Sequence, residues 1–321
     1  MPERRNVILK LGGSTIAIKG DPELEKEFYD LLGLGTGGNI DTKDVIGRAG
    51  KFLKWDILEE LSDGILQFRK QVDDLIIVHG AGIFGHALVS HFMHEARSQR
   101  EFTGWPKTIA MVALQNLYVV SWLQSIGVPA IPFSPHVAFE GLRASFDGVV
   151  THNATMRTDD TLISMLYRGY VPVLFGDMVT DKAGQFRVLS GDTLLPILVR
   201  EIGGIDLVVG VSSFPPGVER EVAVYTKDPT DPQAIPIRKI FVNQIGTPTA
   251  QLDNGKILPL QEALGFDTQK GSDVTGKMAN KVKDLIECAR FGVHGKILGP
   301  KQLLEALTDA PIGTQIVPEM T

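Results

Sequence analysis

The chain has a single cysteine, Cys288, among its 321 residues. One cysteine cannot form an intramolecular disulfide framework or a multi-cysteine metal site, so both are excluded. No apolar run approaches the roughly 20 residues that a membrane-spanning helix needs. Positive charge is also scarce, because 32 Lys and Arg residues stand against 38 Asp and Glu residues, a net charge of −6. A nucleic-acid-binding surface would normally be basic, so we expect neither nucleic acid nor a membrane as a partner.

The N-terminal segment lacks the apolar core of a secretory signal peptide. Together with the lone cysteine, this predicts a reducing, cytoplasmic setting. Hydrophobic residues make up 43% and charged residues 22% of the chain, which is typical of a globular protein and not of a disordered one. The 34 glycines gather in short motifs, so the composition directs attention to turns.

Short apolar runs alternate with stretches of helical spacing along the chain. The apolar runs predict buried strands at residues 7–11, 75–78, 130–133, 169–177, 186–192 and 206–211. The helical spacing predicts helices at residues 51–71, 108–125, 149–168 and 193–202. This alternation predicts a mainly parallel sheet covered by helices on both faces. The glycine-rich stretch 20–50 is expected to be an irregular excursion, and a boundary is expected near residue 185.

The first apolar run contains Lys10 and ends in Gly12, Gly13 and Ser14. A lysine inside a buried strand costs desolvation free energy unless its ammonium group meets an anion or water. Glycines after the strand allow the backbone to approach a ligand closely. The combination favours a phosphate site, and a lysine that faces solvent from an edge strand is the alternative.

A second glycine motif, HGAGIFGH at 79–86, directly follows the run 75–78. Its backbone N–H groups and the start of the next helix suit an oxyanion, which His86 would meet at the mouth of the loop. A dinucleotide-binding turn has similar glycines, but the acidic residue expected about 20 positions later, after another strand, is missing. His86, His91 and His94 lack the spacing of a zinc site, so no metal-ligating set is expected.

Two short segments place an aspartate directly after a glycine, and a third segment contains several lysines. Asp177 follows Gly176, and Asp192 follows Gly191, each at an expected turn. Such aspartates are commonly caps or turn formers, but at converging strand ends they would orient lysines or hold Mg²⁺ through water. The segment 273–281 places lysines in the first turns of a helix, where a polyphosphate would offset their unfavourable interaction with the helix dipole.

In this order, the motifs resemble the amino acid kinase superfamily, and within it the isopentenyl phosphate kinase family, over nearly the whole chain. The resemblance implies a three-layer αβα sandwich around a mainly parallel sheet, as in carbamate kinase. It implies an N-terminal lobe over residues 1–185 that binds the phosphoryl acceptor, and a C-terminal lobe over residues 186–321 that binds ATP. Kinases of this fold are often dimers, so a homodimer is expected.

The implied activity is ATP-dependent transfer of the γ-phosphoryl group to a small-molecule phosphate acceptor, most simply isopentenyl phosphate. Such transfer depends on positioning and charge neutralisation. The implied catalytic residues are Lys10, His86 and Asp192. The implied acceptor-binding residues are Gly80, Ala81, Gly82, Gly85 and Gly191. The residues implied to bind ATP and Mg²⁺, or to orient the groups that do, are Gly12, Gly13, Ser14, Lys19, Asp177, Thr275, Gly276 and Lys281.

The chain departs from the family pattern in three places. An acidic turn is usual where residues 211–217 read VSSFPPG, Ala81 and Ile83 stand where the family favours glycine and a small residue, and the stretch between Lys19 and His79 is long. Other acceptors therefore stay open: another phosphate, a phosphonate such as fosfomycin, or UMP. A non-catalytic nucleotide-binding or oxyanion-binding storage protein is the rival from another class. An apolar slot for a prenyl tail, with core packing as the alternative, would be lined by Phe92, Met93, Phe102, Trp105 and Met111.

Overall fold

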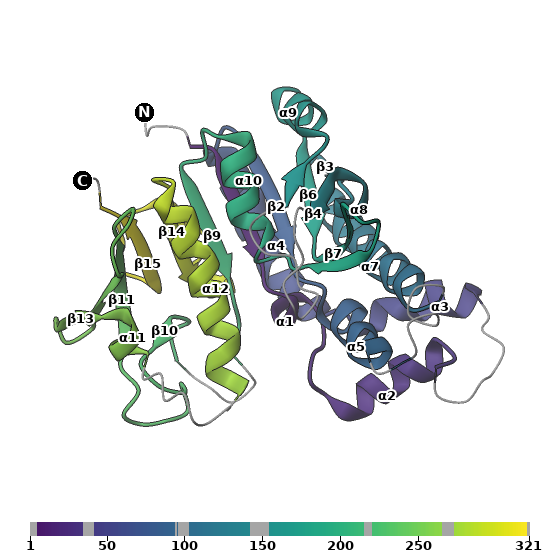
Figure 1. Ribbon diagram of the computed structural model, residues 1–321, viewed down its shortest axis with the longest axis horizontal. Helices are drawn as coiled ribbons and strands as arrows, with labels where there is room; N and C mark the ends of the chain where they lie inside the picture. Colours follow the sequence, from purple (N-terminus) through teal and green to yellow (C-terminus); the bar gives the residue numbers. More distant parts are fainter. Residues whose placement is uncertain are drawn as a thin grey trace.

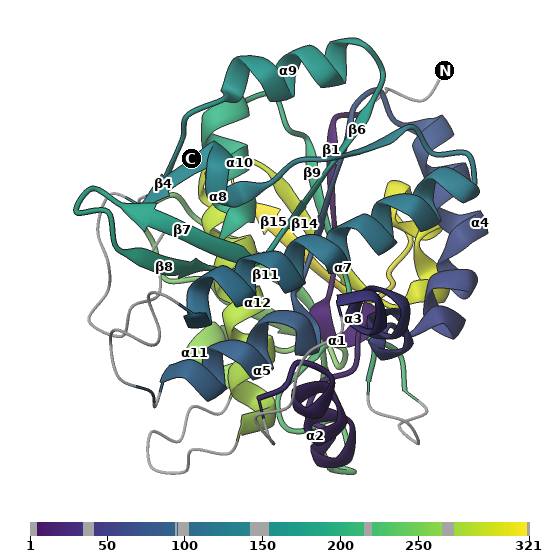
Figure 2. The same ribbon diagram turned by 90° about the vertical axis from the view of Figure 1, so that its right-hand side faces the viewer.

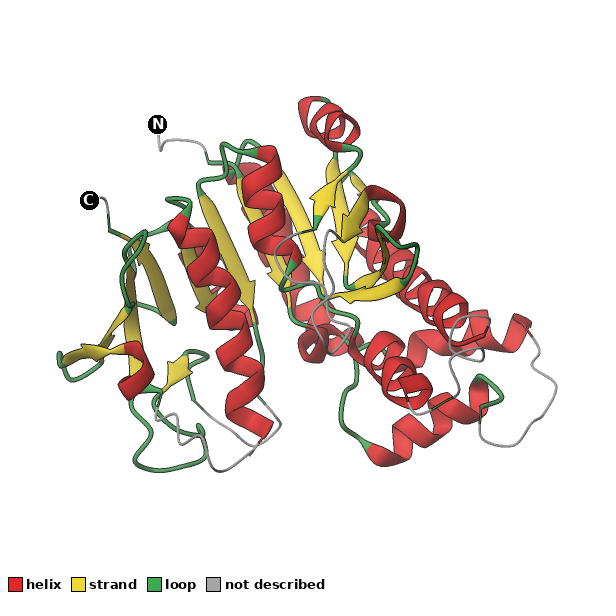
Figure 3. Ribbon diagram, viewed as in Figure 1, coloured by secondary structure: helices red, strands yellow, loops and turns green. Residues whose placement is uncertain are grey.

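A large mixed sheet runs through the middle of the computed structural model, with helices on both faces (Figures 1 and 3). The structure describes residues 5–34, 42–93, 95, 103–141, 154–214, 220–264 and 273–319, and every structural statement below concerns these residues. None of the helices in these ranges is long and apolar enough to cross a membrane. The arrangement is the layered α/β fold that the alternating pattern predicts.

The large sheet has the strand order β13-β12-β11-β15-β14-β9-β1-β2-β6-β3, with β10 paired to β11. Its parallel part comprises β14 (His294–Leu298), β9 (Leu207–Val211), β1 (Val7–Leu11), β2 (Leu75–His79), β6 (Val171–Phe175) and β3 (Ala130–Pro132). The C-terminal end of the sheet adds β15 (Thr314–Pro318), β11 (Pro236–Val242), β12 (Thr249–Leu252), β13 (Ile257–Pro259) and β10 (Val224–Tyr225). Antiparallel pairs join most of these added strands, so the sheet is mixed at that end.

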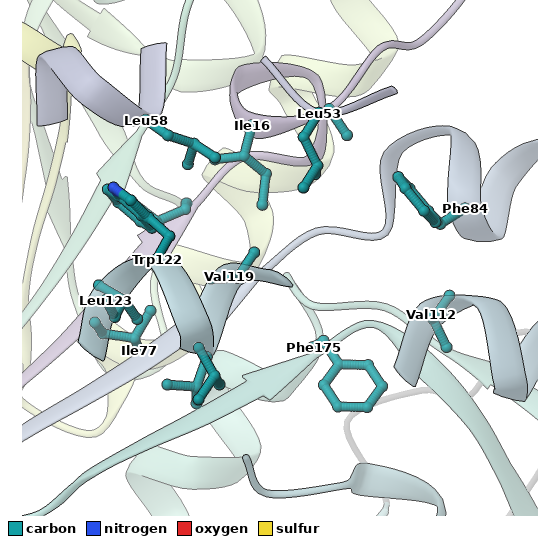
Figure 4. Close-up of a cluster of buried hydrophobic side chains, with 14 of the residues drawn as sticks. Ile16, Leu53, Leu58, Ile77, Phe84, Val112, Val119, Trp122, Leu123 and Phe175 are labelled. Carbon is teal, nitrogen blue, oxygen red and sulfur yellow. The ribbon is translucent and has the colours of Figure 1, made fainter. Parts of the chain in front are cut away.

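The side chains of β1 alternate between two cores. Val7, Leu9 and Leu11 face α4 (Trp55–Gln71), α5 (Gly82–Met93) and α7 (Trp105–Ser125), in the core that Figure 4 shows in part. Ile8 faces the opposite core, formed with α9 (Asp159–Tyr167), α10 (Leu194–Ile202) and α12 (Asp273–Arg290). Figure 2 shows the sheet between these two helix layers. Lys10 has the same parity as Ile8, so its side chain projects toward α10 and α12.

The expectation of an irregular excursion at residues 20–50 was wrong in its described part. This part contains α2 (Pro22–Leu31), α3 (Thr42–Arg48) and the 3₁₀ helix η1 (Ala49–Phe52), after the short α1 (Gly13–Ile16). The Asp21 carboxylate accepts hydrogen bonds from the backbone N–H groups of Glu23 and Leu24, both at 3.1 Å, and Pro22 opens the helix. The ring of Phe28 then meets Phe52 and Phe84 edge-on, which fixes α2 against α5.

A smaller sheet contains β5 (Thr155–Met156), β4 (Phe139–Gly141), β7 (Asp177–Asp181) and β8 (Phe186–Leu189). The expected helix at 149–168 is therefore shorter, because residues 155 and 156 pair with β4. The remaining short helices are α8 (Pro135–Ala138), α11 (Leu260–Ala263), η3 (Pro300–Gln302) and η4 (Leu304–Leu307). The lobe boundary at 185/186 stays a prediction. It falls between β7 and β8, while the large sheet is continuous through the β1–β9 pair.

Candidate functional site

The carboxyl ends of five parallel strands stand level at one edge of the sheet. Leu11 of β1 pairs with His79 of β2 on one side and with Val211 of β9 on the other. The residue that follows each strand in the row β14, β9, β1, β2 and β6 is small: Gly299, Ser212, Gly12, Gly80 and Gly176. Ligands of open α/β sheets bind at this edge, where the small residues leave the backbone accessible.

The glycine turns after β1 and β2 touch backbone to backbone. A Cβ atom on Gly13 would lie 2.8 Å from the backbone nitrogen of Gly82, and a Cβ atom on Gly80 would overlap the backbone of Gly13. Gly82 also has a φ angle of +50°, in the left-handed region that favours glycine. The two motifs that the sequence singled out separately therefore form one surface.

A third turn, before α10, joins this surface through Gly191. A Cβ atom on Gly191 would lie 2.8 Å from the carbonyl oxygen of His79 and 3.0 Å from Cε of Lys10. A Cβ atom on Gly176 would in turn lie 3.1 Å from the nitrogen of Gly191. The turn before α10 can therefore pack against Lys10 only because Gly191 has no side chain.

Lys10 and Asp192 form the charged centre of the site. The Lys10 ammonium donates to Oδ1 of Asp192 at 2.7 Å, and the Lys10 side chain is only 4% exposed. Lys281, from α12, donates to Oγ of Ser212 at 2.7 Å. These four residues and Gly12 line one pocket. Residues far apart in the sequence thus converge there, on the face toward which β1 directs Lys10.

The electrostatics of this pocket favour an anion. Burial alone would raise the pKa of Asp192, but the charges of Lys10, Lys281 and Lys19 hold that pKa below its usual value. Burial lowers the pKa of Lys281, the carboxylate of Asp192 opposes this change, and the charge of Lys10 adds to it. Three lysine charges thus act on one carboxylate, and the excess of positive charge suits a polyphosphate.

His79 is a buried structural residue and lies at the base of the glycine turn. Its Nδ1 is 3.2 Å from the carbonyl oxygen of Gly80, and its Nε2 is 3.1 Å from Nδ2 of Asn116. Burial lowers the pKa of His79 to about 4, which the charge of Lys10 reinforces and the hydrogen bond to Gly80 opposes. The neutral ring therefore donates from Nδ1 and accepts at Nε2.

Two residues of this network escaped the sequence reasoning. Gln115 donates to the carbonyl oxygen of Gly80 at 3.1 Å, and Asn116 also donates to that of Val173 at 3.2 Å. Both are buried polar side chains in α7. A Gln-Asn pair inside the apolar run MVALQNLYVV was the signal that could have identified them, because buried amides need partners.

Asp177 does not have the contacts that we expected. Its Oδ2 accepts hydrogen bonds from the backbone N–H of His136 at 3.1 Å and from Nδ1 of His136 at 2.9 Å. Its Oδ1 accepts from the backbone N–H of Met178 at 2.8 Å. The hydrogen bond to Asp177 raises the pKa of His136. Asp177 therefore fixes α8 against β7, and its hydrogen bonds do not orient Lys10 or Lys281.

The other expected acceptor-binding residues lie at the start of α5. His86 is exposed, one helical turn after Gly82. A Cβ atom on Gly85 would lie 2.6 Å from Cβ of Ala81, so these two residues are in close contact. Ile83 is buried in the core, and its N–H donates to the carbonyl oxygen of Ile18.

The expected nucleotide-binding residues are only partly described. Lys19 is half-buried, and the carbonyl oxygen of Ser14 accepts a hydrogen bond from Lys54 at 2.7 Å. Thr275 and Gly276 belong to the first turn of α12, and their side-chain surroundings lie outside the described part of the chain.

The expected apolar slot is mostly core. Phe92, Trp105 and Met111 are buried in the cluster between the sheet and α5 and α7. Met93 is 46% exposed, and Phe102 lies outside the described residues. The interpretation of core packing therefore holds for three of the five residues.

Parallel strands that end in glycine turns, with the buried Lys10 and the half-buried Lys281 around one carboxylate, define the class of α/β phosphotransferases. Residues 5–298 match the amino acid kinase family, and the chain belongs to this family. It is a phosphotransferase that uses ATP. The resemblance and the fold class expected from the motifs are thus confirmed.

Several curated relatives are isopentenyl phosphate kinases. The protein of Methanothermobacter thermautotrophicus is 28% identical over 326 residues, which is 97% of this chain and 98% of that one. The protein of Methanocaldococcus jannaschii is 30% identical over 206 residues, and this match spans 61% of this chain and 64% of that protein, less than two thirds of its length. The protein of Arabidopsis thaliana is 26% identical over 89% of this chain and 84% of that one.

Two solved structures have the same fold. An X-ray structure of isopentenyl phosphate kinase superposes with a TM-score of 0.65 at 23% identity, covering 97% of this chain and 99% of that one. Carbamate kinase from Giardia lamblia bound to AMP-PNP superposes with a TM-score of 0.56 at 11% identity, covering 99% and 100%. At these identities the likeness shows the fold alone.

Proposed function

We propose that this kinase phosphorylates isopentenyl phosphate to isopentenyl diphosphate. The observation that carries the proposal is the pocket in which Lys10, Asp192 and Lys281 meet beside the contacting glycine turns at Gly13 and Gly80. The turn that contains Gly80 leads into α5, and the acceptor phosphate would bind on that side. Lys281 comes from α12, and ATP would bind on that side. The isopentenyl phosphate kinases among the relatives support the choice of acceptor.

The reaction joins two anions, so the protein must position them and neutralise charge. An oxygen of the acceptor phosphate attacks the γ-phosphorus of ATP, and the bond from that phosphorus to the β–γ bridging oxygen breaks to release ADP. Lys10 and Lys281 would stabilise the charge that develops on the transferring group. Asp192 holds the Lys10 ammonium in place at 2.7 Å. The backbone N–H groups of the glycine turns would hold the acceptor phosphate.

Magnesium bound with the ATP phosphates would supply further positive charge to this pocket. Asp192 is the carboxylate of this pocket, and we propose that it accepts a hydrogen bond from a water of the ion. This contact would add to the task of Asp192 in orienting Lys10.

We propose that His86 donates a hydrogen bond to the acceptor phosphate. His86 is exposed and lies one helical turn after Gly82, on the helix that follows the glycine turn. His86→Ala is then expected to lower kcat/KM for the acceptor at least tenfold, because a hydrogen bond to a charged group is lost, while the thermal unfolding midpoint stays the same. A variant with the wild-type kcat/KM would remove His86 from the reaction.

We also propose a homodimer formed through α7. Between Thr108 and Ser125 this helix contains no charged residue, and Leu117 on its outer side is 53% exposed. Light scattering after size exclusion is expected to give twice the 35.0 kDa chain mass, and Leu117→Asp is expected to shift the protein toward the monomer. A wild-type monomer at assay concentrations would exclude the dimer.

One observation favours a second acceptor class. Three residues of the expected apolar slot are buried in the core and would not line a pocket for a prenyl tail. A compact phosphonate such as fosfomycin is therefore the second candidate. It would use the same phosphate-binding turns without a tail pocket. A nucleoside monophosphate would instead need polar groups that recognise a base.

The experiment is an ADP-release assay with MgATP and five acceptors: isopentenyl phosphate, dimethylallyl phosphate, fosfomycin, UMP and aspartate. We expect turnover with the two prenyl phosphates only. Turnover with another acceptor would keep the transfer site and replace the substrate. Binding of ATP without turnover of any acceptor would favour a binding or storage protein.

A further inference from the structure

Lys281 has a neutral hydrogen-bond acceptor at the point where β9 ends. Its ammonium donates to Oγ of Ser212 at 2.7 Å. Ser212 is 3% exposed, and its own N–H donates to the carbonyl oxygen of Leu298 in β14 at 3.0 Å. The serine is thus anchored between two central strands, and the hydroxyl is a rigid support for a long and flexible side chain.

The two lysines of the pocket are held in different ways. Lys10 donates to the carboxylate of Asp192, whereas Lys281 donates to a hydroxyl. A carboxylate partner neutralises a lysine, but a hydroxyl leaves the full positive charge available to a third group. The single carboxylate of this pocket therefore leaves an excess of positive charge, and Ser212 directs part of it.

We propose that Ser212 is a positioning residue that aims the Lys281 ammonium at the phosphoryl group that ATP transfers. This inference rests on the proposed function of the same site. It gives a task to Ser212, which directly follows β9 and begins the stretch of sequence where the acidic residues usual in the family are absent: this serine supports a lysine and contributes no charge of its own.

Removing the hydroxyl has a specific expected effect on turnover. Ser212→Ala leaves the Lys281 ammonium without this acceptor, so we expect kcat to fall about tenfold, the loss of one charge-assisted hydrogen bond. The KM for isopentenyl phosphate should stay within twofold, because the glycine turns that hold the acceptor are untouched. Ser212→Thr restores the hydroxyl and should recover most of kcat.

Ser213→Ala is the matched control. It removes the neighbouring hydroxyl, which donates to Oγ1 of Thr15 at 3.5 Å, whereas the Lys281 ammonium donates to Ser212. We expect this variant to leave the response of kcat to alkaline pH as in the wild type. Equal effects of Ser212→Ala and Ser213→Ala would show a general disturbance of the turn and would overturn the proposal.

The pH profile separates positioning from a merely structural role. The charged groups that act on Lys281 are Lys10, which lowers its pKa as burial does, and Asp192, which raises it. Loss of the Ser212 acceptor removes a further stabilising contact of the ammonium, so the pKa of Lys281 should fall. The alkaline limb of kcat should then move to lower pH by about one unit, which corresponds to the tenfold effect.

A second measurement needs no turnover. Competitive labelling of lysine amines with acetic anhydride at a series of pH values, read by mass spectrometry, reports the protonation of Lys281 in the protein without substrates. We expect its labelling midpoint to lie at lower pH in Ser212→Ala than in the wild type and in Ser213→Ala. An unchanged midpoint overturns the assignment of Ser212. Absence of turnover in the wild type, with a shifted midpoint, would refute only the proposed function.

Discussion

Lowering the pH should destabilise this protein through protonation of His79 at pH values above those at which most carboxylates are protonated. His79 is fully buried, and burial lowers its pKa from 6.5 to about 4. Between these values the unfolded chain binds a proton that the folded protein does not. The stabilising contribution of the neutral ring is therefore complete above pH 6.5 and is lost progressively down to pH 4. The free energy of unfolding should fall by about 2 kcal/mol between pH 8 and pH 5, and by about 3 kcal/mol at pH 4.

Burial is the main cause of the low pKa of His79, and the hydrogen bond to Gly80 opposes it. Asn116 donates to Nε2, so protonation of that atom would set two donors against each other. The charge of Lys10 adds repulsion to any imidazolium.

Urea unfolding at pH 8 and pH 5 tests this prediction in the wild type and in His79→Gln, which cannot titrate in this range. The wild type should lose about 2 kcal/mol more than the variant between the two pH values. Equal losses would refute the reasoning. Should the variant fail to fold, NMR titration of the His79 ring in the wild type gives the pKa directly, and a midpoint near 6.5 would contradict the account.

Three further predictions concern single side chains. Asp192→Asn should reduce kcat at least a hundredfold in the ADP-release assay, because Lys10 loses its carboxylate and the pKa of Lys281 falls further. Gly80→Ala should abolish turnover and lower the unfolding midpoint, since the new methyl group overlaps Gly13, and wild-type values would contradict the contact. Phe28→Ala should cost about 3–5 kcal/mol of stability in urea unfolding, because it empties the space between Phe52 and Phe84, and a loss below 1 kcal/mol would show that α2 is not fixed there.

Strong periodicity made the central fold predictable. The strands at 7–11, 75–79 and 207–211 and the helix at 105–125 lie where the apolar pattern indicated, because burial on both faces leaves continuous apolar runs. The prediction of an irregular stretch at 20–50 gave too much weight to its glycines. Asp21 and Pro22 are ordinary signals of a helix start, and α2 begins there. The strands β10 to β13 carry no continuous apolar run: β10 has only two residues, β11 and β12 mix buried with half-buried positions, and β13 has none that is buried. Their pairing depends on tertiary contacts that no local pattern reveals.

The glycines and lysines of the site could be predicted from the sequence, whereas the residues that hold the lysines in place were harder to predict. Lys10 stood out because a lysine in a buried strand needs a partner, and Asp192 is that partner. Asp177 follows a small residue at a turn as Asp192 does, yet it binds His136, since only the path of the chain decides which aspartate meets a lysine. Ser212 was unpredictable for the same reason: a serine after a strand is common, and its value here depends on the approach of Lys281 from α12.

The most direct test of the central claim follows the phosphorus atoms. ³¹P NMR of the wild type with MgATP and isopentenyl phosphate should show isopentenyl diphosphate growing in equal amount to ADP. Lys10→Met, which keeps the length of the side chain and removes the charge, should form no diphosphate while its unfolding remains cooperative. ADP formed without diphosphate, or a Lys10→Met variant as active as the wild type, would contradict the assignment of this pocket to phosphoryl transfer.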